Sequence, residues 1–148
     1  MSNRAPSDII AVAADHAGFP LKERLAKELA AAGHQVLDLG TDSTDSVDYP
    51  DFGDAMARAL IDGKAGRGVL ICGTGIGVSI AANRHKGVRA AVCHNAEIAG
   101  LARAHNDANV LVLGGRFVDH ETASACLRSF LETDFEGGRH QRRIDKLD

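Results

Sequence analysis

The residues with the clearest chemical potential form one short stretch, Cys72-Gly73-Thr74-Gly75-Ile76-Gly77-Val78-Ser79. Glycines at alternate positions allow a tight turn and leave backbone N–H groups uncovered. At the start of a helix such groups stabilise negative charge, on a phosphate or on an oxyanion that develops during a reaction. A thiol beside them can form a thiolate near neutral pH and act as a nucleophile or a base. The alternative is a close-packed turn without a ligand, in which Cys72 is an ordinary buried cysteine.

This stretch differs from two common nucleotide-binding motifs. No Lys-Ser or Lys-Thr pair follows the glycines, which excludes a P-loop. Val78 occupies the position of the third glycine in the dinucleotide-binding fingerprint, and the stretch follows the third predicted strand. The glycines therefore do not indicate a nucleotide site.

Two further segments place an imidazole beside other polar groups. Asp15-His16, followed by Gly18, could orient hydroxyl groups or hold a phosphate, or Asp15 could only cap a helix. His105, in the segment His105-Asn106-Asp107, is a candidate acid or base, although a lone histidine is also a common surface residue.

Basic residues gather near the C-terminus. Arg139 and Arg143 lie four residues apart, so on a helix they share one side and could grip a phosphate between two guanidinium groups. The alternative is an ordinary solvated basic face.

The cysteines and histidines indicate neither a disulfide framework nor a metal site. Three cysteines are too few and too scattered for a framework, and we expect Cys93, within a strand, and Cys126, on an apolar helix stripe, to belong to the core. Close ligand spacing is absent from the candidate metal ligands His85, Cys93, His94 and His105. The spacing of these residues therefore predicts no metal site.

Alternating strands and helices must position these groups. Apolar runs rich in Val and Ile predict parallel strands, buried on both faces, at residues 8–14, 34–39, 67–72, 88–93 and 109–113. Apolar residues at helical spacing predict helices between these strands, shorter helices after Gly75 and Asn95, and a terminal helix at 138–146. The alternation predicts an α/β fold, a three-layer α/β/α sandwich around a five-stranded parallel, Rossmann-like sheet. In such folds ligands bind beyond the carboxyl ends of the strands, where Asp15, Cys72, His94 and Arg116 are expected.

Length and composition bound the class of protein. The 148 residues suit one domain, with 1–7 as a loose tail. A net charge of −3 argues against a nucleic-acid partner, and no apolar run is long enough to span a membrane. The N-terminus lacks the apolar stretch of a signal peptide, so we expect a cytoplasmic protein.

Taken together, the motifs resemble the type B ribose-5-phosphate isomerases and their relatives among the galactose-6-phosphate isomerases. The resemblance spans about residues 8–144 and rests on an ordered set of matches: Asp15-His16 with Gly18, Gly40-Thr41, Asp48-Tyr49-Pro50, Cys72 to Gly77, Ala81-Ala82-Asn83, His105 to Asn109, Gly114 with Arg116, and Glu136-Gly137-Gly138-Arg139-His140. One subtype of this family has a cysteine where Cys72 stands, and the other has a glutamate where this sequence has Val78. The chain therefore resembles the cysteine subtype, and His94 lies at a position that varies in the family.

The resemblance implies aldose–ketose isomerisation of ribose 5-phosphate and ribulose 5-phosphate through an enediolate, without a cofactor. It implies that Cys72 moves the proton and that backbone amides from Gly73 to Gly77, Gly75 included, stabilise the enediolate oxygen. His105, helped by Asp15, would open the sugar ring, and Thr74 or Ser79 would pass hydroxyl protons.

The resemblance also implies how the rest of the sugar phosphate is held. The phosphate would bind His16, Arg116, Arg139 and Arg143, with Tyr49 and His140 nearby and Asn106 on the sugar hydroxyls. Members of the family are dimers or tetramers with each site built from two subunits, so we expect a homo-oligomer with its active site at the interface.

Several alternatives stay open at this point. The same chemistry could act on a tetrose 4-phosphate or a hexose 6-phosphate, because a pocket one carbon longer or shorter changes few residues. A catalytically inactive sugar-phosphate-binding protein would keep the fold, but the presence of Cys72, Asp15 and His105 together argues against it. A thiol-redox protein is disfavoured because Cys72 has no second cysteine close in sequence.

Overall fold

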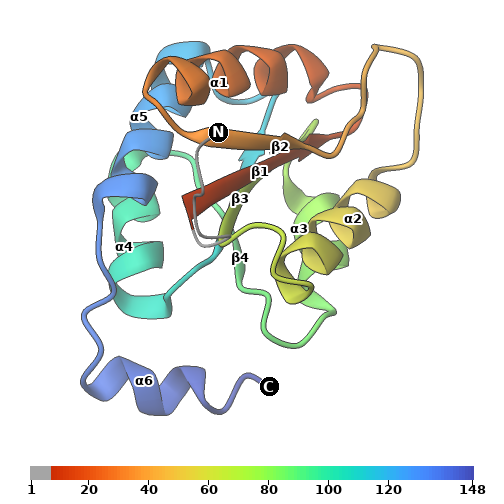
Figure 1. Ribbon diagram of the computed structural model, residues 1–148. Helices are drawn as coiled ribbons and strands as arrows, with labels where there is room; N and C mark the ends of the chain where they lie inside the picture. The colour runs from red at the N-terminus through yellow and green to blue at the C-terminus, as the bar shows by residue number, and fades with distance from the viewer. Residues whose placement is uncertain (1–7) are drawn as a thin grey trace.

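The computed structural model describes residues 8–148, so the predicted tail at 1–7 lies outside the described residues. The described chain alternates strands and helices, and Figure 1 shows them as one layered unit. In chain order the elements are β1 (Ile9–Ala14), α1 (Phe19–Ala31), β2 (Gln35–Asp38), α2 (Tyr49–Ile61), β3 (Arg67–Cys72), α3 (Ile76–Asn83), β4 (Ala90–Val92), α4 (Ala96–Asn106), β5 (Val110–Gly114), α5 (His120–Glu132) and α6 (Arg139–Ile144).

The five strands form one sheet in the order β2-β1-β3-β5-β4, and every pair in it is parallel. The central strands β1, β3 and β5 are almost wholly buried, which explains their continuous apolar sequence. This arrangement confirms the predicted parallel sheet. The predicted strand ranges are right to within two residues at each end, and Cys93 lies just after β4 rather than within it.

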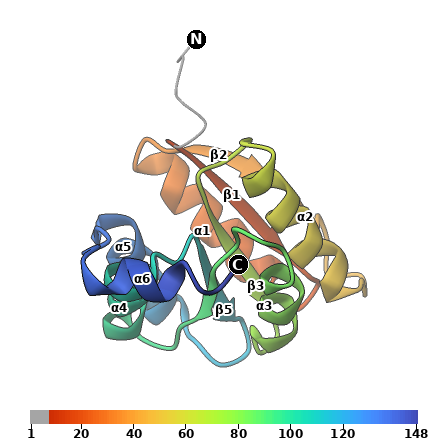
Figure 2. The ribbon, with the colours of Figure 1, turned by 90° about the horizontal axis from the view of Figure 1, so that it is seen from below.

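Helices cover both faces of the sheet, which confirms the predicted three layers. One core cluster joins the sheet to α1, α4 and α5 through residues such as Leu25, Ala102 and Phe130. The second cluster joins the opposite face to α2 and α3 through Met56 and Val78. Figure 2 shows α2 and α3 on one side of the molecule and α4 and α5 on the other. No helix within residues 8–148 is long and apolar enough to cross a bilayer.

The strand order defines where a ligand is expected. The chain moves from β1 to β2 in one direction and from β2 back past β1 to β3 in the other, so the order reverses between β1 and β3. Ligands of open parallel sheets bind beyond the carboxyl ends of the two strands at such a reversal. Here those two ends carry Asp15 and Cys72.

Candidate active site

The thiol of Cys72 lies at the end of β3, where the glycine-rich turn leads into α3. The backbone N–H of Gly75 donates a hydrogen bond of 3.2 Å to the sulfur Sγ of Cys72. Gly75 makes this contact with a φ of 81°, a left-handed conformation that glycine adopts without strain. The turn therefore directs a donor at the sulfur, where it would stabilise negative charge.

Asp15 shapes the neighbouring loop between β1 and α1. Its carboxylate oxygen Oδ1 accepts hydrogen bonds from the backbone N–H groups of Ala17 (3.0 Å) and Gly18 (3.1 Å). Gly18 has no room for a side chain, because an added Cβ would lie 2.6 Å from the carbonyl oxygen of Ile71. This loop consequently packs directly on the end of β3, beside Cys72.

The loop after β5 closes the other side of Cys72. The N–H of Gly115 donates to the carbonyl of Cys72 (2.8 Å), and the N–H of Arg116 donates to the carbonyl of Gly73 (3.0 Å). The Arg116 guanidinium lies against Gly73, since a Cβ added there would be 3.1 Å from its Nη1 atom. A cation therefore lies next to the glycine-rich turn, where an anionic substrate would be attracted.

Tyr49 and His16 reach the same edge of the sheet from other elements. The Tyr49 ring, at the start of α2, lies over Gly77 and leaves no room there for a Cβ atom. The N–H of Val47 donates to Nδ1 of His16 (3.2 Å), so Nε2 carries the proton when this imidazole is neutral. Both side chains are thus positioned by contacts within the chain.

The two hydroxyl groups of the glycine-rich segment have different environments. Thr74 is exposed, and its Oγ1 accepts a hydrogen bond from the N–H of Ile76 (3.1 Å). The Ser79 hydroxyl donates to the carbonyl of Ile76 (2.7 Å) within the first turn of α3. The lone pairs of Ser79 stay available as acceptors.

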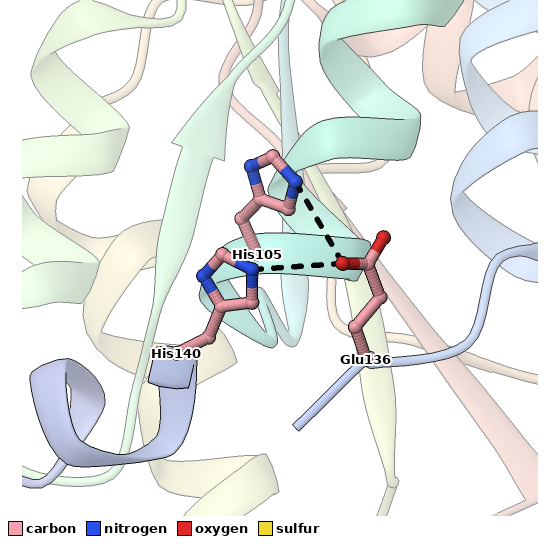
Figure 3. Close-up of side chains that lie close together, drawn as sticks. All are labelled: His105, Glu136 and His140. Carbon is pink, nitrogen blue, oxygen red and sulfur yellow. Dashed lines mark ion pairs between the residues drawn. The ribbon is translucent and has the colours of Figure 1, made fainter. Parts of the chain in front are cut away.

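A second group of polar side chains lies at the other end of the strands, beyond their amino ends. Figure 3 shows the imidazoles of His105, at the end of α4, and His140, in α6, both facing the carboxylate of Glu136. The rings stack with centroids 4.4 Å apart and planes inclined by 15°. Burial, with help from the Arg139 guanidinium and His105, lowers the pKa of His140 below its ordinary value, so this imidazole is neutral near pH 7.

A small cavity adjoins this second group. It has a volume of about 280 Å³ and is lined by His105, Asn106, His140, Arg143, Ile144 and Leu147. Arg139 begins the same short helix α6, which Figure 1 shows below the sheet, away from the loop between β1 and α1. Imidazole, amide and guanidinium groups around one cavity suit an anionic, hydroxylated ligand.

One chain does not bring all the predicted site residues together. Cys72 lies at the carboxyl end of β3, whereas His105 lies in the last turn of α4, which leads into the amino end of β5. A five-residue strand such as β5 separates the two edges by roughly 13 Å. Within a protomer the first group (Asp15, His16, Tyr49, Cys72 to Ser79 and Arg116) and the second group (His105, Asn106, Arg139, His140 and Arg143) are separate half-sites.

The other two cysteines differ from Cys72 in their surroundings. Cys93 and Cys126 are completely buried, which confirms their predicted place in the core. Burial raises the pKa of Cys93 to about 12, and burial also raises the pKa of Cys126. Neither thiol therefore forms a thiolate near neutral pH.

The structure also brings together a set of possible metal ligands that sequence reasoning missed. One nitrogen each from His105 and His140 and one oxygen from Glu136 lie within 4.8 Å of one another. His105 is distant in sequence from the other two residues, but Glu136 and His140 lie four residues apart. That spacing was the available signal for this site.

Comparison with known proteins agrees with the geometry. The family model described as Ribose/Galactose Isomerase matches residues 10–147. The Escherichia coli protein named ribose-5-phosphate isomerase B is 44% identical over 138 residues, which cover 93% of each chain.

Two solved structures share the fold over nearly the whole chain. A ribose 5-phosphate isomerase from Thermotoga maritima has a TM-score of 0.93 and 50% identity, over 95% of this chain and 97% of the other. Ribose-5-phosphate isomerase B from Mycoplasma genitalium, with bound ribulose 5-phosphate, has a TM-score of 0.89 and 44% identity, over 94% and 93% of the two chains. The chain therefore belongs to the Ribose/Galactose Isomerase family, which confirms the family and the class of enzyme predicted from its sequence.

Proposed function

We propose that this protein interconverts ribose 5-phosphate and ribulose 5-phosphate. Relatives covering more than nine-tenths of the chain carry that activity in their names, and one of them holds ribulose 5-phosphate in its structure. The half-site around Cys72 offers the matching groups: a thiol, the backbone N–H that Gly75 directs at it, and the Arg116 cation. The observation that carries the proposal is the 3.2 Å hydrogen bond from Gly75 to the Cys72 sulfur.

In the proposed reaction the Cys72 thiolate is the base. It removes the proton from carbon 2 of the open-chain aldose, and the electron pair of that C–H bond forms the double bond of an enediolate. The thiol then returns the proton to carbon 1, while the hydroxyl proton passes from the oxygen on carbon 2 to the oxygen on carbon 1 by way of Ser79 or Thr74. The product is the ketose, with no net gain or loss of atoms. Backbone N–H groups of the glycine-rich turn stabilise the enediolate oxygen, a contribution of about 3–4 kcal/mol per well-placed donor.

The proposed active site needs two subunits. Ring opening is assigned to His105 of the partner subunit, because this chain's own His105 lies at the other edge of the sheet. Exposed apolar side chains beside Cys72 support such an association: Ile76 and Ile80 on α3 are 58% and 52% exposed, and Phe117 is 71% exposed. We therefore propose a homo-oligomer in which each site joins the two half-sites across an interface.

Phosphate binding is likewise divided. His16 and Arg116 approach from the half-site that holds Cys72. Arg139 and Arg143 would complete the phosphate site from the second half-site, whose cavity Arg143 lines. Four basic side chains around a phosphate would explain how a chain with net charge −3 binds an anionic sugar.

Replacing the proposed base tests this function. Cys72→Ser should remove nearly all turnover and leave substrate binding largely unchanged, because a serine hydroxyl is far too weak a base at neutral pH. The measurement is isomerisation of ribose 5-phosphate together with binding of ribulose 5-phosphate. Cys126→Ser, which changes a core thiol far from the turn, should keep normal kcat/KM in the folded protein. Near-normal turnover of Cys72→Ser would refute the assignment.

A second sugar phosphate is the main competing substrate, since the family description names both ribose and galactose. Comparing kcat/KM for four-, five- and six-carbon aldose phosphates decides the question. Ribose 5-phosphate should give the highest value. A higher kcat/KM for a tetrose 4-phosphate or a hexose 6-phosphate would leave the proposed isomerisation unchanged. It would show that ribose 5-phosphate is not the preferred substrate.

A further inference from the structure

The structure places one carboxylate beside two imidazoles, in a geometry that the proposed reaction does not require. We call this group the imidazole–carboxylate cluster; its members are His105, Glu136 and His140. That reaction uses His105 and places His140 near the phosphate, but it gives Glu136 no part. We propose that the cluster binds one divalent transition-metal cation, and that Zn²⁺ is the best match. Figure 3 shows the three groups that would hold it.

The separations within the cluster fit metal ligation better than hydrogen bonding. Nε2 of His140 lies 3.5 Å from Oε1 of Glu136, and Nε2 of His105 lies 4.0 Å from the same oxygen. Both exceed the roughly 3.2 Å limit of a good N–H···O hydrogen bond. Bonds of about 2.0–2.1 Å to a tetrahedral ion place two ligands about 3.4 Å apart, whereas the three ligand atoms here lie within 4.8 Å of one another. Because an imidazole binds a metal in the plane of its ring, the half-exposed His105 ring would turn out of its stack with His140 as the ion binds.

The types of ligand favour zinc and its neighbours in the transition series. Two imidazole nitrogens and one carboxylate oxygen form a set that Zn²⁺ accepts with a fourth position open to water. Mg²⁺ and Ca²⁺ prefer oxygen ligands, so this cluster should bind them poorly. His105 and Glu136 are 40% and 56% exposed, which leaves room for an ion to enter and for its water.

One member of the cluster is already short of a partner. His140 is 6% exposed, and its buried Nε2 has no hydrogen-bond partner among the described residues. A buried polar atom without a partner is costly, and a metal ion bound there would remove that cost. This atom points into the cluster, toward Glu136 (Figure 3).

The backbone holds the cluster together. The N–H of Glu136 donates to the carbonyl of Ala104 (3.0 Å), which ties the loop before α6 to the last turn of α4. Gly137 and Gly138 have φ values of 67° and 55°, and these left-handed conformations return the chain so that His140 faces Glu136. Much of the ordering that a metal site needs is therefore present in the fold.

Two guanidinium groups beside the cluster disfavour the binding of a metal cation there. Arg139 and Arg143 lie close enough to His140 to influence its charge state. Their repulsion weakens any cation at the cluster, whereas the Glu136 carboxylate attracts it. We accordingly expect a reversible site that chelators empty, in contrast to a permanent structural zinc.

Calorimetric titration of the chelator-treated protein with Zn²⁺ in phosphate-free buffer tests the site. We expect one ion per chain, and no comparable heat with Mg²⁺. Glu136→Gln and His140→Asn should each weaken Zn²⁺ binding at least about tenfold, since even changes outside the ligand shell cost that much. His34→Asn removes a histidine outside the cluster and should bind as the unaltered protein does. Circular dichroism and thermal unfolding establish that each variant is folded.

Replacing Zn²⁺ by Co²⁺ adds a readout of the ligands themselves. Tetrahedral Co²⁺ absorbs visibly, and this absorption should appear with the unaltered protein and with His34→Asn but not with His140→Asn. Absence of a stoichiometric Zn²⁺ heat, or equal binding by all the variants, would overturn the proposal and leave the free His140 nitrogen to the substrate alone.

Activity separates this inference from the proposed function. A metal at the cluster occupies the lone pair of His105, so on the ring-opening role proposed above Zn²⁺ should inhibit turnover of cyclic ribose 5-phosphate and a chelator should restore it. Zn²⁺ that binds with the expected stoichiometry but does not inhibit would support the metal site and contradict the assignment of His105. Inhibition that persists in His140→Asn would mean that Zn²⁺ acts elsewhere, and would overturn the link.

Discussion

At the scale of single residues, chemistry depends on what each group touches. Cys72 is buried, at 5% exposed, and within residues 8–148 it alone of the three cysteines accepts a hydrogen bond from a backbone N–H. Cys93 and Cys126 lie among apolar side chains, where burial raises the pKa of each thiol. A shared residue type therefore gives one candidate base and two core residues.

The raised pKa of Cys93 predicts a pH dependence of stability. In the unfolded chain this thiol titrates near 9.0, but in the folded protein its pKa is about 12. Above pH 9 the unfolded state therefore loses a proton that the folded state retains, and the free energy of unfolding falls as pH rises towards 12. Its slope should be up to about 1.4 kcal/mol per pH unit for this one group.

Urea unfolding at pH values between 8 and 11 measures this effect by comparison with Cys93→Ala. The variant should be less stable than the unaltered protein at every pH, because it lacks the buried sulfur. Its free energy of unfolding should nevertheless fall less steeply above pH 9. Parallel curves would show that Cys93 titrates alike in both states.

The arginines of α6 give a matched pair for phosphate binding. Arg143 lines the cavity beside His105, whereas Arg142 does not and points about 100° away around the helix. Arg143→Ala should weaken binding of the phosphorylated sugar about tenfold to a hundredfold, because a charge-assisted hydrogen bond is worth roughly 1.5–3 kcal/mol.

Steady-state kinetics with ribose 5-phosphate should show this loss as a raised Michaelis constant, and Arg142→Ala should change it little. Any weak activity on unphosphorylated ribose should be unaffected by either change. Equal losses from both arginines would mean that α6 has a structural role and that the phosphate is bound elsewhere.

At the scale of elements, the half-site around Cys72 depends on loops that pack without side chains between them. Gly18 touches the end of β3, and Gly115 approaches Ala17 of the same loop, with an added Cβ 3.2 Å from its carbonyl oxygen. Hydrogen bonds from Gly115 and Arg116 then join the loop after β5 to the turn that holds Cys72. Three strand ends thus act as one rigid platform, which a catalytic thiol requires.

Gly18→Ala should disturb this platform. Its new methyl group would lie 2.6 Å from the backbone oxygen of Ile71, and that atom cannot move aside without shifting β3. We expect a loss of about 1–3 kcal/mol in the free energy of unfolding, as for other overpacked sites, with turnover strongly reduced.

Asn95→Ala is the matched control, because it weakens a helix start without entering the platform. Its side chain caps α4 by accepting a hydrogen bond of 2.9 Å from the N–H of Ile98, so its loss should cost about 1 kcal/mol. Turnover at a temperature where both variants are folded is the measurement. Equal turnover in the two would show that the platform tolerates the added methyl group.

At the scale of the whole molecule, two half-sites occupy opposite edges of the sheet. The first, at the end of β3, contains the proposed base, and the second, at the end of α4 and in α6, contains His105, Arg139 and Arg143. Neither half has all the groups that the proposed reaction needs. Association of two copies would supply each half with its complement, as two-fold symmetry allows.

Mixing two inactive variants tests this division. In a mixed dimer of Cys72→Ser and His105→Asn subunits, one site combines the intact Cys72 with the intact His105, and the other site has neither. Refolding the two together in equal amounts should therefore restore about a quarter of the normal activity, since half of the dimers are mixed and each has one complete site of two.

Each variant refolded alone is the control and should stay inactive on cyclic ribose 5-phosphate. No recovery on mixing, with mixed dimers demonstrated by mass spectrometry, would place both residues in the site of a single subunit or remove one of them from the mechanism.

The elements and the candidate residues of the first half-site could be predicted from the sequence alone. Buried parallel strands need continuous apolar residues and helices need a stripe, so both are visible in local periodicity. The glycine-rich turn after Cys72 was visible for the same reason, because its donors and its thiol are consecutive in the chain. Asp15 could be assigned to the same site because the carboxyl ends of all parallel strands lie along one side of the sheet.

The arrangement of the remaining groups depends on contacts that appear only in the folded protein. Local sequence does not contain the strand order β2-β1-β3-β5-β4, which places Asp15 beside Cys72. Nor does it show that His105 ends a helix at the far edge, because that depends on the direction in which the helix returns across the sheet. Glu136 gained significance because its hydrogen bond to Ala104 and two left-handed glycines place its carboxylate beside the edges of two stacked imidazoles. Contacts between distant segments are set by packing of the whole chain, and packing leaves no local pattern in a single sequence.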